Sequence, residues 1–105
     1  MQSPNRRAYV RTPKKPEFAR KPLMRIAALL GGPKAFAAFF GGEPHLFYNW
    51  KNRNDGFFPT GSLEEAKERL VVRGEKFEPG FLTDEGRFAQ DEAGVWRRSE
   101  LEAAE

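Results

Sequence analysis

Apolar residues recur at helical spacing from residue 22 onward, and proline and glycine divide the pattern into short segments. Segment 22–30 opens on a proline suited to a first helical turn and stops at Gly31-Gly32. Segment 33–40 also opens on a proline and stops at Gly41-Gly42. The pattern predicts two short helices joined by a glycine turn. The apolar stripe of the first consists of Leu23, Ile26, Ala27 and Leu30.

A third helix is expected over residues 44–52, with Pro44 near its start and the turn signal Asn54-Asp55-Gly56 behind it. Large aromatic side chains in such segments are core residues far more often than ligand-stacking ones. We therefore expect this set of side chains to pack inward: Phe36, Phe39, Phe40, Leu46, Phe47 and Trp50.

The second half of the chain changes character. Ser62 and Glu65 have capping-box spacing at the start of a fourth helix, which Gly74 closes. The stretch FEPGFLTDEGRFA predicts a small β-hairpin around Asp84-Glu85-Gly86. Residues 90–105 then read as a terminal helix with acidic residues in its first turn.

These elements define a mainly α fold, a small helix-turn-helix bundle of four to five helices with a short C-terminal β-hairpin plus helix. Residues 1–21 contain three prolines and few apolar residues, which indicates a basic flexible arm. The helix-turn-helix domain is expected over 22–75. A hairpin-helix extension, 76–105, is expected to pack on the bundle.

The helix-turn-helix interpretation rests on spacing. Two helices that cross closely need a small residue in the first one, and Ala37 meets that need. Gly41 supplies the residue that tolerates a positive φ in the turn, and Phe47 and Trp50 face back onto the first helix. The opposite face then carries an imidazole, a phenol and two amides at i, i+3, i+4 and i+7, which are His45, Tyr48, Asn49 and Asn52.

Charge is distributed unevenly. Residues 1–25 hold eight basic groups and one acid, whereas residues 26–105 hold ten basic and fourteen acidic groups. A basic arm on a mildly acidic body is common in proteins that bind a polyanion, although a solvated tail explains it equally well. The absence of cysteine and of a signal-peptide pattern favours the cytoplasm.

Several other function classes are excluded by the same residues. No Gly-Lys pair follows a glycine loop, so a phosphate loop is not expected, and charges and glycines interrupt any membrane span. His45 is the only histidine, so neither a zinc site nor a Ser-His-Asp set can be assembled. We expect no enzyme, no cofactor and no metal.

The stretch LLGGPKAFAAFFGGEPHLFYNWKNR resembles the Cro/C1-type helix-turn-helix of phage and bacterial repressors, and in particular its short Cro-like antitoxin and regulator branch. The resemblance covers roughly residues 23–60. It is carried by Leu30, Gly31, Gly32, Ala35, Phe36, Ala37, Gly41, Phe47, Asn49 and Trp50.

This resemblance implies a nucleoid-associated transcriptional regulator, repressor-like, that binds double-stranded DNA as a homodimer and inserts helix 44–52 into the major groove. Base reading would fall to His45, Tyr48, Asn49 and Asn52. Backbone contacts would come from Lys34, Lys51 and Arg53. The arm residues Arg6, Arg7 and Arg11 would enter the adjacent minor groove or follow the backbone.

Two departures from the family pattern bear on DNA binding. Gly42 replaces the usual apolar residue after the turn, which would loosen the link between the helices. Glu43 stands where Ser or Thr commonly caps the recognition helix, and its carboxylate would repel a phosphate. The alternative is a protein-interaction adaptor or inhibitor of phage-like origin that keeps the helix-turn-helix scaffold without binding DNA.

Overall fold

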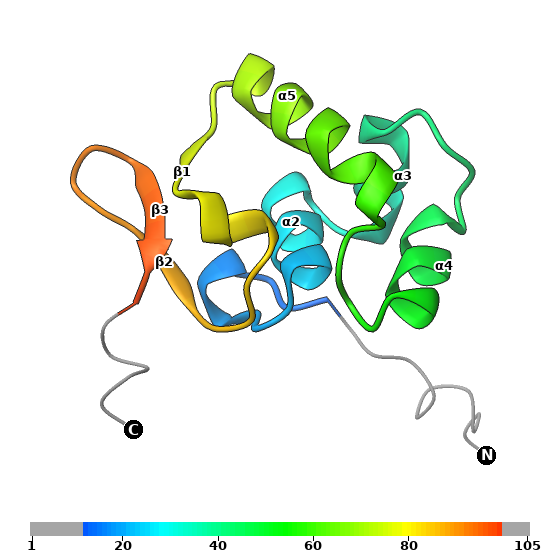
Figure 1. Ribbon diagram of the computed structural model, residues 1–105, viewed down its shortest axis with the longest axis horizontal. Helices are drawn as coiled ribbons and strands as arrows, with labels where there is room; N and C mark the ends of the chain where they lie inside the picture. Colours follow the sequence, from blue (N-terminus) through cyan, green and yellow to red (C-terminus); the bar gives the residue numbers. More distant parts are fainter. Residues whose placement is uncertain (1–11, 100–105) are drawn as a thin grey trace.

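The computed structural model describes residues 12–99. In this range four α-helices lie together, and a small three-stranded sheet lies beside them, on the left in Figure 1. The elements are η1 (Pro16–Phe18), α2 (Pro22–Leu30), α3 (Pro33–Phe39), α4 (Leu46–Arg53), η2 (Thr60–Ser62), α5 (Leu63–Arg73), β1 (Lys76–Phe77), η3 (Pro79–Leu82), β2 (Phe88–Gln90) and β3 (Val95–Arg98).

The ends of α2 and α3 follow from their glycine pairs. Gly31 has φ 112° and Gly41 has φ 69°, both in the left-handed region that favours glycine. The amide of the following glycine then bonds back into the helix, Gly32 to the Ala27 carbonyl at 2.7 Å and Gly42 to that of Ala37 at 2.9 Å. Both glycine pairs therefore act as helix stops that satisfy terminal carbonyls.

The predicted capping box of α5 is wrong. Ser62 makes no side-chain capping hydrogen bond, and η2 leads directly into the helix. Glu65 is instead engaged by Arg69, one turn further on, with 2.9 Å between Arg69 Nε and Glu65 Oε2. Arg69 also donates to the backbone carbonyl of Phe39 at 3.0 Å, so the pair attaches α5 to α3.

The chain before α2 is folded from residue 16 on. Pro16 opens η1, which packs against α2 and β2, and Ala19 behind it is only 3% exposed. That part of the expected flexible arm is therefore integrated with the domain. Residues 1–11, with Arg6, Arg7 and Arg11, lie outside the described residues.

The predicted hairpin around Asp84-Glu85-Gly86 is also wrong. Its first apolar piece divides into β1 and η3, because Pro79 starts a 3-10 helix whose Phe81 and Leu82 are buried. The strand order is β1-β3-β2, in which β1 pairs with β3 in parallel and β2 pairs with β3 antiparallel. The hairpin of the fold is therefore β2–β3.

Residues 90–99 do not form the predicted terminal helix. Gly94 has φ 83°, and the Asp91 carboxylate accepts hydrogen bonds from the amides of Ala93 and Val95 at 2.9 and 3.0 Å. These local bonds close a turn in place of a first helical turn. The Arg97 guanidinium, 2.7 Å from Asp91, lowers the pKa of that carboxyl. Residues 100–105, the rest of the predicted helix, lie outside the described residues.

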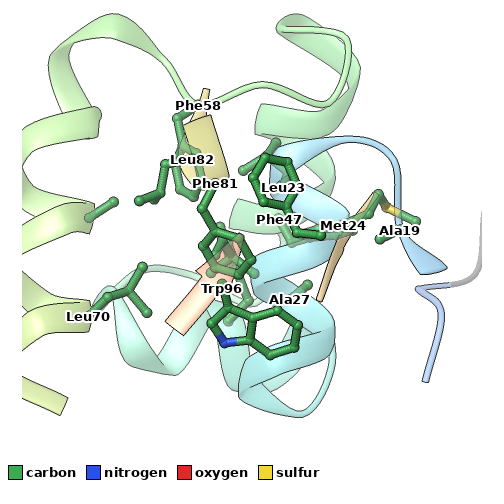
Figure 2. Close-up of a cluster of buried hydrophobic side chains, with 14 residues drawn as sticks. Ala19, Leu23, Met24, Ala27, Phe47, Phe58, Leu70, Phe81, Leu82 and Trp96 are labelled. Carbon is green, nitrogen blue, oxygen red and sulfur yellow. The ribbon is translucent and has the colours of Figure 1, made fainter. Parts of the chain in front are cut away.

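One hydrophobic core joins the helices to the sheet (Figure 2). Leu23 and Phe47 come from the helical half, and Phe81 stacks on Trp96 at 5.2 Å in the C-terminal half. All four side chains are at most 5% exposed. The C-terminal segment therefore contributes side chains to the same core as the helices.

Arg25 is the one charged residue among the buried residues of the described range, at 0% exposed on α2. Its guanidinium donates to four backbone carbonyls and lies 4.2 Å from the centre of the Phe88 ring. The carbonyls belong to Arg20, Phe81, Asp84 and Gly86. Arg25 thus ties α2 to the segment before it, to η3 and to the loop that follows η3.

In the range that the structure describes, no helix is both long enough and apolar enough to cross a membrane.

Candidate functional site

Helix α4 is held by an aromatic cluster on its inner side. Phe47 is fully buried, and its ring meets that of Phe36 edge-on, with centroids 5.4 Å apart. Trp50 is half-buried and stands perpendicular to Phe36 at 5.8 Å. Phe58, from the loop behind α4, stacks on Phe36 at 6.1 Å. Phe36 of α3 is therefore the central contact that sets the position of α4.

The turn into α4 covers residues 40–45. The Leu46 amide donates to the Glu43 carbonyl at 2.9 Å, so residues 43–46 form a turn and α4 begins at Leu46, two residues later than predicted. His45 then occupies the N-cap position. A Cβ on Gly42 would lie 2.8 Å from Leu46 Cδ2. The side chain of Leu46 therefore lies against the backbone of Gly42.

The residues that the sequence assigned to helix packing lie inside. Ala37 is 2% exposed in α3, which packs on both α2 and α4. Phe36 is fully buried, whereas Phe39 and Phe40 are partly buried against the core.

The outer face of α4 presents amide and imidazole groups. His45, Asn49 and Asn52 are exposed, and they lie on the side opposite Phe47. These side chains can both donate and accept hydrogen bonds, which suits recognition of a patterned polar surface.

Tyr48 lies at the edge of this face and is half-buried. Its ring meets that of Phe47 edge-on at 5.3 Å. It also lines a hollow with residues 12–14 and with the glycine turn 31–33. The first described residues of the chain, including the exposed Lys14, are therefore next to α4.

The predicted backbone-contacting cations differ in exposure. Lys34, in the first turn of α3, and Arg53, in the last turn of α4, are exposed, and Lys51 is half-buried. Arg25, which the charge count included among the basic N-terminal residues, is buried and unavailable to a ligand.

A second hollow lies between the start of α2 and the end of α4. Three cations line it, Lys21, Lys51 and Arg53, together with Met24, Asn52, Asp55 and Gly56. We call it the basic hollow. Lys21 Nζ is 3.1 Å from Asp55 Oδ2 and 4.9 Å from the centre of the Phe57 ring. The hydrogen bond to Asp55 raises the pKa of Lys21.

Lys21 was not identified from the sequence as a site residue. It precedes the first turn of α2, 30 positions before Lys51, and no local pattern shows that the start of α2 lies beside the end of α4. In the structure, the Leu23 amide donates to the Gly56 carbonyl at 2.9 Å and holds the end of α4 against the start of α2. This packing brings Lys21 close to Lys51 and Arg53.

Within residues 12–99, no group of three or more His, Cys, Asp or Glu side chains is placed to hold a metal ion.

Comparison with protein-family models, with curated proteins and with solved structures found no match to this chain.

Proposed function

We propose that the protein binds double-stranded DNA sequence-specifically, with α4 in the major groove, and acts as a repressor-like transcriptional regulator. The observation that carries this proposal is the outer face of α4. It combines the exposed hydrogen-bonding groups of His45, Asn49 and Asn52 with a rigid aromatic attachment through Phe47. Base edges are read by such groups when the helix that carries them is fixed.

The dimensions of α4 suit this role. An α-helix with its side chains is about 10–12 Å across, and the eight residues Leu46–Arg53 make about two turns of it. The major groove is about 12 Å wide and admits one α-helix. In this arrangement Asn49 would bind adenine N6 and N7, and His45 would bind guanine.

Cations on the flanks of α4 would position the helix. Lys34, Lys51 and Arg53 lie on α3 and α4 and would contact phosphates. Lys14 lies in the segment that lines a hollow with Tyr48, and it would be a further phosphate contact beside α4. We propose that Arg6, Arg7 and Arg11 contact the adjacent minor groove, and that two copies bind an inverted repeat.

Glu43 opposes this arrangement locally. It is exposed in the turn before α4, where its charge would repel a phosphate. Together with the exposed apolar side chains of Val71 and Val72 on α5, at 62% and 87%, it favours the second candidate function, a protein-interaction adaptor without DNA binding.

Replacing Asn49 by alanine tests the base-reading role. The full chain is used to select fragments from a random duplex pool, and both forms are then titrated with the selected sequence and its single-base variants. We expect Asn49→Ala to lose about 1–3 kcal/mol of discrimination, about 5- to 150-fold, at one base position. The melting temperature should not change, because the side chain is exposed.

The matched control is Gln90→Ala, which removes an exposed amide from β2. It should leave the preferences intact. Unchanged preferences in Asn49→Ala would exclude Asn49 as a base-reading residue, and unfolding of that variant would contradict its exposed position.

A further inference from the structure

The basic hollow at the end of α4 holds more positive charge than its neighbourhood neutralises. Lys21, Lys51 and Arg53 line it, and Asp55 is the only acid among its lining residues in the described chain. Glu85 approaches from outside the lining, with its Oε2 3.4 Å from Lys21 Nζ. The hollow therefore keeps a net positive charge even when both acids are counted.

The hollow also adjoins the proposed reading face. Asn52 belongs both to the exposed stripe of α4 and to the lining of the hollow. A phosphate that binds in the hollow would therefore lie one side chain away from a base-contacting position.

Lys21 is held at the edge of the hollow by weak contacts. Its side chain is 30% exposed and that of Asp55 is 88% exposed, so solvent screens the ion pair between them. The Phe57 ring beneath the ammonium keeps the stem of Lys21 in place without occupying its hydrogen-bond donors. An incoming phosphate could thus replace Asp55 as the partner of Lys21 at little cost.

From these contacts we propose that the basic hollow binds a backbone phosphate of nucleic acid through Lys21, Lys51 and Arg53, and that Asp55 is a built-in competitor for Lys21. This inference rests on the proposed function, since the ligand is a phosphodiester of duplex DNA. It adds Lys21 as a DNA contact outside the helix pair α3–α4, and it implies that Asp55 lowers the affinity for DNA.

The first test removes the cation. Lys21→Gln removes the charge and keeps a shorter polar side chain, and Lys67→Gln on α5 is the control with the same charge change outside the hollow. Both variants are titrated with one random-sequence duplex at 50–200 mM salt. We expect Lys21→Gln to weaken binding to this duplex more than Lys67→Gln does, and to reduce the magnitude of the salt slope by about 0.9, the value for one phosphate contact.

The second test removes the competitor. Asp55 has φ 54°, a left-handed conformation that asparagine also tolerates, so Asp55→Asn keeps the turn. We expect binding about two- to fivefold tighter at 50 mM salt, the range of an exposed ion pair. Glu64→Gln on α5 is the charge-matched control and should have a smaller effect. In a Lys21→Gln background the gain from Asp55→Asn should shrink, because the cation that it competes for is absent.

The outcomes separate this inference from the function on which it rests. If wild type binds duplex but Lys21→Gln matches Lys67→Gln, or if the gain from Asp55→Asn persists without Lys21, the hollow is not a phosphate site while DNA binding stands. If the wild-type protein does not bind duplex at 50 mM salt, the proposed DNA-binding function is contradicted, and the inference about the hollow is contradicted with it. Melting curves of each variant identify any loss of binding that comes from unfolding.

Discussion

Replacing Arg25 by methionine is expected to destabilise the domain by about 3–5 kcal/mol, one of the two largest effects expected for a single change in this protein. The guanidinium binds four backbone carbonyls, at 2.6 Å from Gly86 and 3.0 Å from Asp84 in two of the bonds. Methionine fills a similar volume but donates no hydrogen bond. The bonds to Phe81 and Gly86 are buried, and each of these two carbonyls left without its donor costs about 1–3 kcal/mol. The Arg20 carbonyl keeps the Gly86 amide as a donor.

The measurement is chemical denaturation followed by tryptophan fluorescence. Trp96 is a suitable probe because it stacks on Phe81, the ring over which the Arg25 guanidinium lies. Arg25→Lys should be intermediate, because a compact ammonium cannot span carbonyls on two loops. Arg73→Met is the matched control on the surface of α5, where the side chain is 39% exposed, and should stay within about 0.5 kcal/mol. Near-wild-type stability of Arg25→Met would show that the hydrogen bonds from Arg25 to the backbone carbonyls do not stabilise the fold.

Phe36→Ala is the second large effect, expected at about 3–5 kcal/mol. Phe36 is fully buried, and ring contacts at 4.9–6.1 Å join it to Phe40, Phe47, Trp50 and Phe58. Truncation would leave a cavity between α3 and α4 and would remove edge-to-face contacts worth about 0.5–1.5 kcal/mol each.

Phe18→Ala is the matched control, because Phe18 is 61% exposed and its truncation should cost little. Phe36→Leu keeps more of the apolar volume and should retain the fold at reduced stability. If DNA binding depends on a fixed α4, Phe36→Leu should weaken sequence preference more than it weakens non-specific binding. If Phe36→Ala and Phe18→Ala were equally stable, the central position of Phe36 in the aromatic cluster would be contradicted.

The helical half of the fold could be predicted because its signals are local. Pro22 and Pro33 start helices, Gly31 and Gly41 stop them, and the apolar spacing of α2 identifies its buried face. Each of these features acts within one or two turns of the chain, so the sequence carries it directly.

The rest of the fold depends on distant contacts. β1 pairs with β3 in parallel, with Phe77 opposite Trp96, 19 positions later in the sequence. No local pattern predicts such a pairing. Asp91 and Gly94 fit both an acidic helix start and a turn, and the buried Trp96 decides between them. Arg25 looks like one more basic residue until the loops around η3 are in place.

The candidate site shows the same division. The exposed stripe of α4 could be predicted from helical spacing, since it needs only the direction in which Phe47 points. The site role of Lys21 could not be predicted, because its nearness to Lys51 and Arg53 depends on the packing of α2 against α4. Gly42 lies against the side chain of Leu46, a contact that the sequence does not show.

The most direct measurement is an equilibrium titration of the full chain with a fluorescent random-sequence duplex between 50 and 200 mM salt. We predict micromolar or tighter binding at 50 mM salt. Three phosphate contacts from Lys34, Lys51 and Arg53 would already give a slope of log K against log salt of about −2.7, and further contacts would make it steeper. No binding at 50 mM salt, or binding that salt leaves unchanged, would contradict the proposal that α4 is a DNA-reading helix.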